Sequence, residues 1–195
     1  MKKKEILIIV AHPDDETIWA GGLLLRTKFN KTIICLCRKN DKDRFPKFKK
    51  ACEILKANGY IFGLDDSEEG YYKKISLREM IEKISRVTKG KNYDYIFTHG
   101  ENGEYGHIRH VEVHNAVIEM LKKGLLSAKK TFFFSYKKRK FQKYAIHNSN
   151  ADKLIKLNCD ELFMKKNLIK NIYGYEKRGF EEKSSGEIEA FDIKK

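Results

Sequence analysis

The chain of 195 residues has 41 Lys and Arg against 27 Asp and Glu, which gives it a formal net charge of +14. Its content of 41% hydrophobic and 12% aromatic residues is too high for a disordered chain, and the length suits one domain with its own core. No apolar run approaches the roughly 20 residues that span a bilayer, so we expect no transmembrane segment.

The basic charge has two interpretations. It suits contact with nucleic acid or with an anionic surface. Most of the basic residues are Lys and are spread along the whole chain, however, which is also typical of a composition that only favours solubility. The second interpretation is favoured.

Two features concern the compartment. The apolar stretch 6–11 is interrupted by His12-Pro13-Asp14-Asp15, so we do not expect a cleaved secretion signal. The four cysteines lack the spacing of a metal site and are expected to be free thiols in a reducing compartment. A cytoplasmic location is expected, and peripheral association with a membrane is compatible with the charge.

Apolar runs alternate with amphipathic segments along the first two thirds of the chain. Strands are expected at residues 4–10, 32–37, 60–64, 93–98 and 131–136. Helices are expected from residue 16 onward and at residues 45–58, 76–89 and 108–123. Gly59 is expected to end the second of these helices. The alternation predicts an α/β domain with a mainly parallel sheet of about five strands and right-handed crossovers.

The last third of the chain is less regular and is expected to form a small C-terminal extension. Its expected elements are an edge hairpin at 136–144, a helix at 160–173, a mobile loop at 177–186 and a late strand at 186–193. We therefore predict a single domain over residues 1–195, with its core at 4–136 and the C-terminal elements at 137–195.

Two polar segments follow the first and fourth expected strands. The first is Ala11-His12-Pro13-Asp14-Asp15-Glu16, and the second runs from His99 to His107 and continues to His110 and His114. Ligands of open α/β sheets bind beyond the carboxyl ends of the strands. One Asp at a helix start is usually an N-cap, and a lone His near a helix end is more often a surface residue. The two segments together favour a catalytic site.

These residue types match the needs of metal-dependent hydrolysis. A catalytic zinc takes three ligands from His and carboxylates, and a carboxylate outside this set acts as general base. His12, Asp15 and one histidine of the second segment supply the ligand types, and Asp14 supplies the base. A second histidine can stabilise the oxyanion or protonate the leaving group. Iron or cobalt accepts the same ligands as zinc.

The spacing His110-Val-Glu112-Val-His114 invites comparison with the H-E-x-x-H motif of metalloproteases. In that motif the Glu directly follows the first His, whereas Glu112 lies two positions after His110. On a helix this places it about 200° around the axis, facing away from a metal on the histidines. The metalloprotease interpretation is therefore rejected.

The segments Ala11-His12-Pro13-Asp14-Asp15-Glu16 and Tyr105-Gly106-His107-Ile108-Arg109-His110 resemble the PIG-L/LmbE-like family of zinc-dependent N-acetylglucosamine de-N-acetylases. The resemblance covers about residues 4–136. It implies a Rossmann-like three-layer fold, zinc bound by His12, Asp15 and His110, and Asp14 as general base. It also implies that His107 stabilises the tetrahedral intermediate.

The resemblance extends to the helix that contains Arg44, because the family has an arginine near the substrate there. Lys47 stands where the family has Glu, and Ile108-Arg109 where many members have Pro-Asp. Arg44 and Tyr105 are the candidate substrate-binding residues. Tyr105 can donate a hydrogen bond to an oxyanion or sugar hydroxyl, or else pack beneath its loop.

We therefore expect a hydrolase that removes the acetyl group from an N-acetylglucosamine-type conjugate, using water activated by zinc. The charge adds the expectation that the conjugate is anionic, through a nucleotide, phosphate or lipid. The alternative is a non-catalytic module that binds nucleic acid or an anionic surface through Lys137-Lys138-Arg139-Lys140. The chain has no motif for a specific nucleic acid, so none is expected as partner. Residues 65–69 are expected to form a solvated loop, and His114 to have a structural role.

Overall fold

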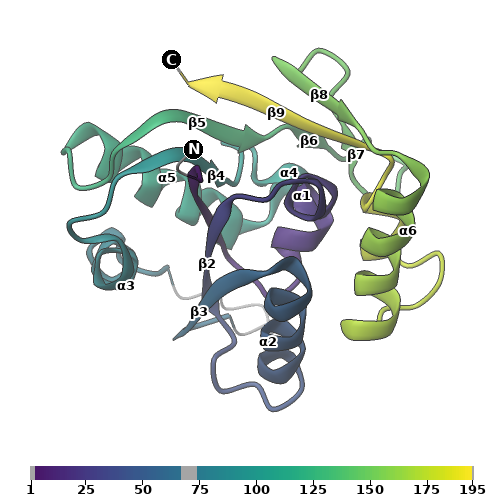
Figure 1. Ribbon diagram of the computed structural model, residues 1–195, viewed down its shortest axis with the longest axis horizontal. Coiled ribbons are helices and arrows are strands. Elements are labelled where there is room, and N and C mark those ends of the chain that lie inside the picture. The colour runs from purple at the N-terminus through teal and green to yellow at the C-terminus, as the bar shows by residue number, and fades with distance from the viewer. Residues whose placement is uncertain (1–2, 67–73, 195) are drawn as a thin grey trace.

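The computed structural model describes residues 3–66 and 74–194, and a twisted sheet between two layers of helices forms its centre (Figure 1). Within these residues the main sheet has seven strands in the order β3-β2-β1-β4-β5-β9-β8. The strands are β1 (Glu5–Val10), β2 (Asn30–Cys37), β3 (Ala57–Leu64), β4 (Tyr93–Thr98), β5 (Ala128–Phe134), β8 (Lys153–Lys156) and β9 (Ile188–Lys194). The first five pair in parallel, whereas β9 and β8 are antiparallel.

The helices cover both faces of this sheet. One face carries α1 (Asp15–Arg26), α2 (Arg44–Leu55), α6 (Cys159–Asn167) and its π-helical continuation η1 (Leu168–Ile172). The other carries α3 (Leu77–Thr88) and α5 (Ile108–Lys122). Shorter elements are α4 (Gly103–Gly106), α7 (Phe180–Ser184) and the paired strands β6 (Tyr136–Lys137) and β7 (Ile146–His147). None of the helices in the described ranges has the length and apolar character needed to cross a membrane. The predicted three-layer α/β fold is confirmed.

The central strand β1 shows why its sequence is apolar throughout. Ile6, Ile8 and Val10 pack into the cluster beneath α1 and α2, and Leu7 and Ile9 pack into the cluster beneath α3 and α5. Each such side chain is fully buried and contributes about 1.5 to 3 kcal/mol through burial. A strand that is covered on both faces cannot alternate apolar with polar residues.

The order of the strands places the functional site. After β1 the chain turns to α1 on one face, and after β4 it passes through the short α4 to α5 on the opposite face (Figure 1). Neighbouring strands whose connections diverge in this way leave a crevice at their carboxyl ends. The two polar segments of the sequence occupy this position.

The expectation that Gly59 ends the second helix is wrong. The helix ends at Leu55, where Lys56 takes the left-handed conformation (φ 53°), and Gly59 lies inside β3, opposite Ile33. A Cβ atom at residue 59 would stand 2.5 Å from Cys52 Sγ. The glycine therefore allows close packing of the strand against α2 and has no capping role.

The C-terminal third belongs to the same core. β9 and β8 extend the main sheet beyond the five expected strands. Lys165 of α6 and Glu189 of β9 form a fully buried ion pair at 2.8 Å. Glu189 also accepts hydrogen bonds from the backbone N–H groups of Gly22 and Leu23 in α1. This pair ties the C-terminal elements to the helix that begins at the candidate site.

Two expectations for this third need correction. The mobile loop at 177–186 is wrong, because α7 forms there and packs Phe180 against Tyr105, with ring centroids 4.7 Å apart. The hairpin at 136–144 is wrong in extent, because Tyr136 pairs with His147 and the residues between β6 and β7 form a loop. The expected helix at 160–173 and late strand at 186–193 are confirmed as α6 with η1 and as β9.

Candidate metal centre and active site

The crevice brings together donor groups of three residues from the two polar segments: one imidazole nitrogen each of His12 and His110, and the two carboxylate oxygens of Asp15. His12 Nδ1 lies 3.3 Å from Asp15 Oδ2 and 3.2 Å from His110 Nε2, and His110 Nε2 lies 3.4 Å from Asp15 Oδ1. With metal–ligand bonds of about 2.0 to 2.1 Å, ligands of a tetrahedral zinc stand about 3.3 Å apart. The spacing and the chemistry of these three residues therefore fit a zinc ion or a similar transition metal.

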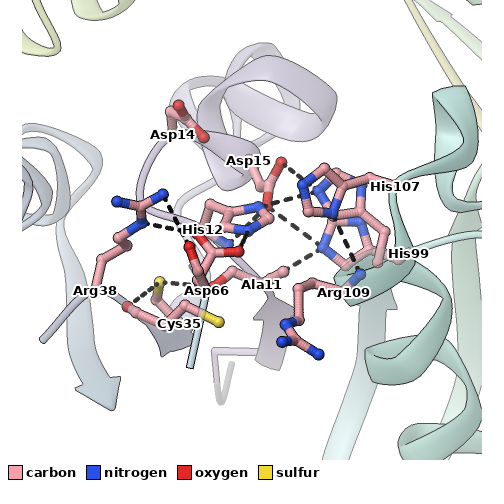
Figure 2. A network of polar contacts seen from close by, with 12 residues as sticks. Ala11, His12, Asp14, Asp15, Cys35, Arg38, Asp66, His99, His107 and Arg109 are labelled. Atoms are coloured by element: carbon pink, nitrogen blue, oxygen red, sulfur yellow. Dashed lines mark hydrogen bonds and ion pairs between the residues drawn. The ribbon is translucent and has the colours of Figure 1, made fainter. Parts of the chain in front are cut away.

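A carboxylate lies behind each of the two imidazoles, and Figure 2 shows the one behind His12, which belongs to Asp66. His12 Nε2 is 3.0 Å from Asp66 Oδ1, and His110 Nδ1 is hydrogen-bonded to Glu104 Oε2. An ionised carboxylate only accepts hydrogen bonds, so Nε2 of His12 and Nδ1 of His110 act as donors. The opposite ring nitrogens, Nδ1 of His12 and Nε2 of His110, face the carboxylate of Asp15. Carboxylates behind metal-ligating histidines orient the rings and fix their tautomers.

Asp15 is held from its own segment. Its Oδ2 accepts a hydrogen bond from the backbone N–H of His12 at 2.8 Å, and its Oδ1 accepts one from Trp19 Nε1 at 2.9 Å. The spacing of four residues places Trp19 one helical turn along α1 from Asp15, on the same side. Both contacts orient the carboxylate toward the histidines.

His99 stacks on His110 at 3.9 Å between ring centroids, but its nitrogens are used for other contacts. Nε2 accepts the backbone N–H of Ala11 at 3.0 Å, and Nδ1 donates to Glu104 at 2.9 Å. His99 is close enough to Asp15 and His110 to form a possible ligand group with them. Because both ring nitrogens are engaged, His99 supports the centre and is not assigned as a ligand.

The metal-free chain binds a proton at His12. Burial lowers the pKa of His12, but hydrogen bonds and charge from Asp15 and Asp66 outweigh it and raise the pKa to about 10. Burial lowers the pKa of His110, so that ring is neutral. His12 Nδ1 therefore donates to His110 Nε2. A metal held by His12 and His110 would take the place of that proton.

Asp14 lies beside the donor cluster in a strained conformation. Its φ of 124° is rare for a residue with a side chain and costs about 1 to 3 kcal/mol. The carboxylate accepts a hydrogen bond from the hydroxyl of Tyr175 and lies 3.3 Å from Arg44 Nη1. Burial and the nearby charge of Asp15 raise the pKa of Asp14 well above its usual value. The Asp14 carboxylate is therefore a stronger base than an ordinary aspartate.

His107 caps the N-terminus of α5. Its Nδ1 accepts the backbone N–H of Arg109 at 3.2 Å, so in the neutral ring the proton is on Nε2. Burial, with the charge of His12 and the proximity of His110, lowers the pKa of His107 to about 3. His107 is thus a neutral imidazole near pH 7 that can donate one hydrogen bond.

A cavity of about 150 Å³ lies beside the donor groups. Its wall is formed by residues from the loops after β1, β2 and β3, from α1, α2 and α4, and from the segment around α7, and includes His12, Asp14, Asp15, Arg44, Asp66, Tyr105, His107, Tyr175 and Phe180. Tyr105 also packs against Trp19 and Phe180. The candidate substrate residues Arg44 and Tyr105 are therefore both on the cavity wall.

Three residues at the centre were not identified from the sequence. Asp66 was expected in a solvated loop but contacts His12 and Arg38, the latter at 2.7 Å. It follows the carboxyl end of β3, so the rule used for the other two loops also points to it. Glu104 lies within the second polar segment. Tyr175 had no sequence signal, because only the fold of the C-terminal third brings it to Asp14. Residues 67–69 of the expected loop lie outside the described residues.

Other side chains have structural contacts. His114 Nδ1 donates to the carbonyl oxygen of His99 at 2.9 Å, as expected for a structural residue. Glu112 accepts from Arg109 at 2.6 Å, away from the metal donors. Glu16 is fully buried and accepts from the backbone N–H of Asp14 and from Tyr173. This bond to Asp14 helps to hold the strained turn.

A Rossmann-like sheet with a His/Asp cluster at its switch point defines a metal-dependent hydrolase as the class to consider. Residues 7–121, more than half of the chain, match the PIG-L family model, which is described as GlcNAc-PI de-N-acetylase. The chain therefore belongs to the PIG-L family, as its motifs indicated. Membership supports a hydrolase of the deacetylase type, and the family is in general metal-dependent.

A curated relative has no described activity. The chain is 28% identical over 124 residues to an uncharacterized protein of Acanthamoeba polyphaga mimivirus. The match covers 55% of this chain and 54% of that protein, so the chain spans about half the length of this relative.

Proposed function

We propose that the protein removes the acetyl group from an N-acetylated amino sugar, an N-acetylglucosamine-type conjugate, in a zinc-dependent reaction. The observation that carries the proposal is the close approach of three donor groups beside a cavity that Asp14 lines: the ring nitrogens of His12 and His110 lie 3.2 Å apart, and each lies 3.3 to 3.4 Å from one oxygen of Asp15. The family description supports the acetamide as the bond that is cleaved. The proposed anionic character of the conjugate is supported by the net charge of +14.

His12, Asp15 and His110 would hold the metal. When bound, zinc polarises the carbonyl group and lowers the pKa of water. Asp14 takes a proton from the attacking water while the water oxygen forms a bond to the acetamide carbon. The raised pKa suits this step, because a stronger base accepts the proton more readily.

His107 donates the Nε2–H hydrogen bond to the carbonyl oxygen as negative charge develops there. The backbone N–H of Arg109 fixes this tautomer before substrate binds. In this role His107 keeps its proton, and Asp14 is the group that carries one. The proton that Asp14 received therefore passes to the sugar nitrogen as the C–N bond breaks, which yields acetate and a free amine.

Arg44 and Tyr175 orient the general base. Both contact the same Asp14 oxygen, and the Arg44 guanidinium carbon lies 4.6 Å from the centroid of the Tyr175 ring. The remaining oxygen of Asp14 is then available to water. The proposed location is the cytoplasm, which is supported by the free thiols of all four cysteines.

The test compares two variants for bound zinc and for acetate release from free, nucleotide-linked and lipid-linked N-acetylglucosamine. Asp14→Asn is expected to keep its zinc and lose about 100-fold or more in rate. His110→Ala is expected to lose zinc. Asp43→Asn, which changes an exposed carboxylate directly before α2, is the matched control. Full activity of Asp14→Asn would refute the base assignment, and full zinc occupancy of His110→Ala would refute the ligand set.

A further inference from the structure

Residues 137–143, from the last residue of β6 into its connection with β7, form a basic loop with an aromatic side chain at its tip. Five of its seven residues are Lys or Arg, and the chain has no Asp or Glu from residue 137 to residue 151. The backbone N–H of Gln142 donates to the carbonyl oxygen of Arg139 at 2.9 Å. Lys140 and Phe141 therefore occupy the central positions of a tight turn.

Phe141 is 93% exposed, the highest value among the large apolar side chains of the described residues. A single exposed apolar residue is common on soluble proteins and needs no partner. Here the ring stands at the tip of a turn, with Lys140 Nζ 5.9 Å from its centroid. All five cations of the loop are exposed as well. The loop thus combines an apolar side chain at its tip with cationic side chains on both sides of it in the sequence.

The base of the loop is fixed to the core. Tyr136 is buried and pairs with His147, and its carbonyl oxygen accepts a hydrogen bond from Asn102 Nδ2 at 2.8 Å. At the other end, the backbone N–H of Ala145 donates to Ser184 Oγ of α7 at 3.1 Å. A tip that projects from a fixed base loses little conformational entropy when it binds.

We propose that the basic loop docks the protein on an anionic lipid bilayer. Phe141 would enter the boundary between headgroups and acyl chains, and the surrounding cations would lie over anionic headgroups. The loop matches both parts of a lipid surface, because its apolar tip suits the acyl chains and its cationic flanks suit the anionic headgroups.

Nucleic acid fits the same loop less well. Proteins that bind single strands stack successive bases on several aromatic rings along a charged groove. The tip offers one ring only. The nearby Tyr144 ring has Lys183 Nζ 5.3 Å from its centroid, which leaves that face covered. The lipid surface is therefore the favoured partner.

The loop is connected to the cavity through α7. Ser184 anchors the loop, and Phe180 and Glu181 of the same helix line the cavity. Docking would thus fix the orientation of the cavity wall relative to the bilayer. The docking proposal does not depend on the proposed hydrolysis, because binding to vesicles is measured without substrate.

The experiment is co-sedimentation of the full chain with vesicles of phosphatidylcholine, alone and with about 30% phosphatidylserine. The wild type is expected to bind only the anionic vesicles. The variant Lys138→Gln/Arg139→Gln/Lys140→Gln is expected to bind on the order of 100-fold more weakly, because each cation near such a surface contributes about fivefold. Phe141→Ala is expected to bind about tenfold more weakly.

The matched control is Lys89→Gln/Lys91→Gln/Lys122→Gln, which removes the same charge from exposed positions on other segments. Its binding is expected to change by less than about threefold. Equal losses in the two triple variants, or no binding of the wild type to anionic vesicles, would overturn the proposal. Polyuridylate binding that requires the loop, without vesicle binding, would assign the loop to nucleic acid instead.

Discussion

Glu104 joins the two histidines at the centre, and the substitution Glu104→Gln removes its charge with almost no change of shape. The side chain is fully buried. Its Oε1 accepts the backbone N–H of Gly100 at 2.8 Å, and its Oε2 accepts from Nδ1 of His99 and of His110. A glutamine keeps the first contact and places an NH2 group toward the two imidazole N–H groups.

The size of the effect follows from these contacts. Two charge-assisted hydrogen bonds are lost, and each contributes about 1.5 to 3 kcal/mol. His110 can avoid the repulsion between the two N–H groups by changing tautomer, so that its proton lies on Nε2. Nε2 is the nitrogen assigned to the metal, and a protonated nitrogen cannot bind it. Metal affinity is therefore expected to fall about 10- to 100-fold, which is about 1.4 to 2.7 kcal/mol.

The assay is a zinc titration against a competing chelator, with thermal unfolding of the metal-free protein to confirm that the variant is folded. Glu101→Gln is the control, because it makes the same chemical change on an exposed residue of the same loop. A zinc affinity of Glu104→Gln within about twofold of the wild type would show that the carboxylate does not hold His110 for the metal.

Two further predictions concern the same site. The pKa of about 10 at His12 means that zinc binding releases one proton, since the ligand must be neutral. The dissociation constant for zinc is therefore expected to fall about tenfold per pH unit between about pH 6 and 9, measured by chelator competition, and a flat profile would contradict it. Tyr175→Phe removes the hydroxyl that contacts Asp14, so kcat for acetate release is expected to fall about tenfold while bound zinc stays constant. Loss of zinc in this variant would instead make Tyr175 part of the metal centre.

Local patterns were sufficient for the parallel part of the fold. The continuous apolar runs of β1 and β4 and the helical periodicity of α3 reflect burial on both faces of a sheet or on one face of a helix, and such patterns are visible in the sequence itself. The two polar segments were identified because the strand rule places both at one edge of the sheet.

The wrong expectations concern residues whose type suits more than one structural role. Gly59 is a helix terminator in the local pattern, yet the structure uses its missing side chain to bring β3 close to Cys52. Asp66 was one acidic residue among several in its segment. Only the pairing of β3 beside β2 places it against His12. Neither outcome depends on local spacing.

The sequence by itself determined the family, the layered α/β fold and the two segments that supply the candidate ligands and base, because these depend on motifs and periodicity. Tertiary structure alone decided which groups stand behind them. Asp66, Glu104 and Tyr175 come from three separate segments, and their carboxylate and hydroxyl groups meet the site only when β3, α4 and the segment after η1 converge on it. The run of cations from Lys137 to Lys140 is visible in the sequence, but only the fold shows that Phe141 beside it is exposed. The strand rule and the second polar segment point to the regions of Asp66 and Glu104, but their contacts with the histidines, and the contact of Tyr175 with Asp14, are products of packing.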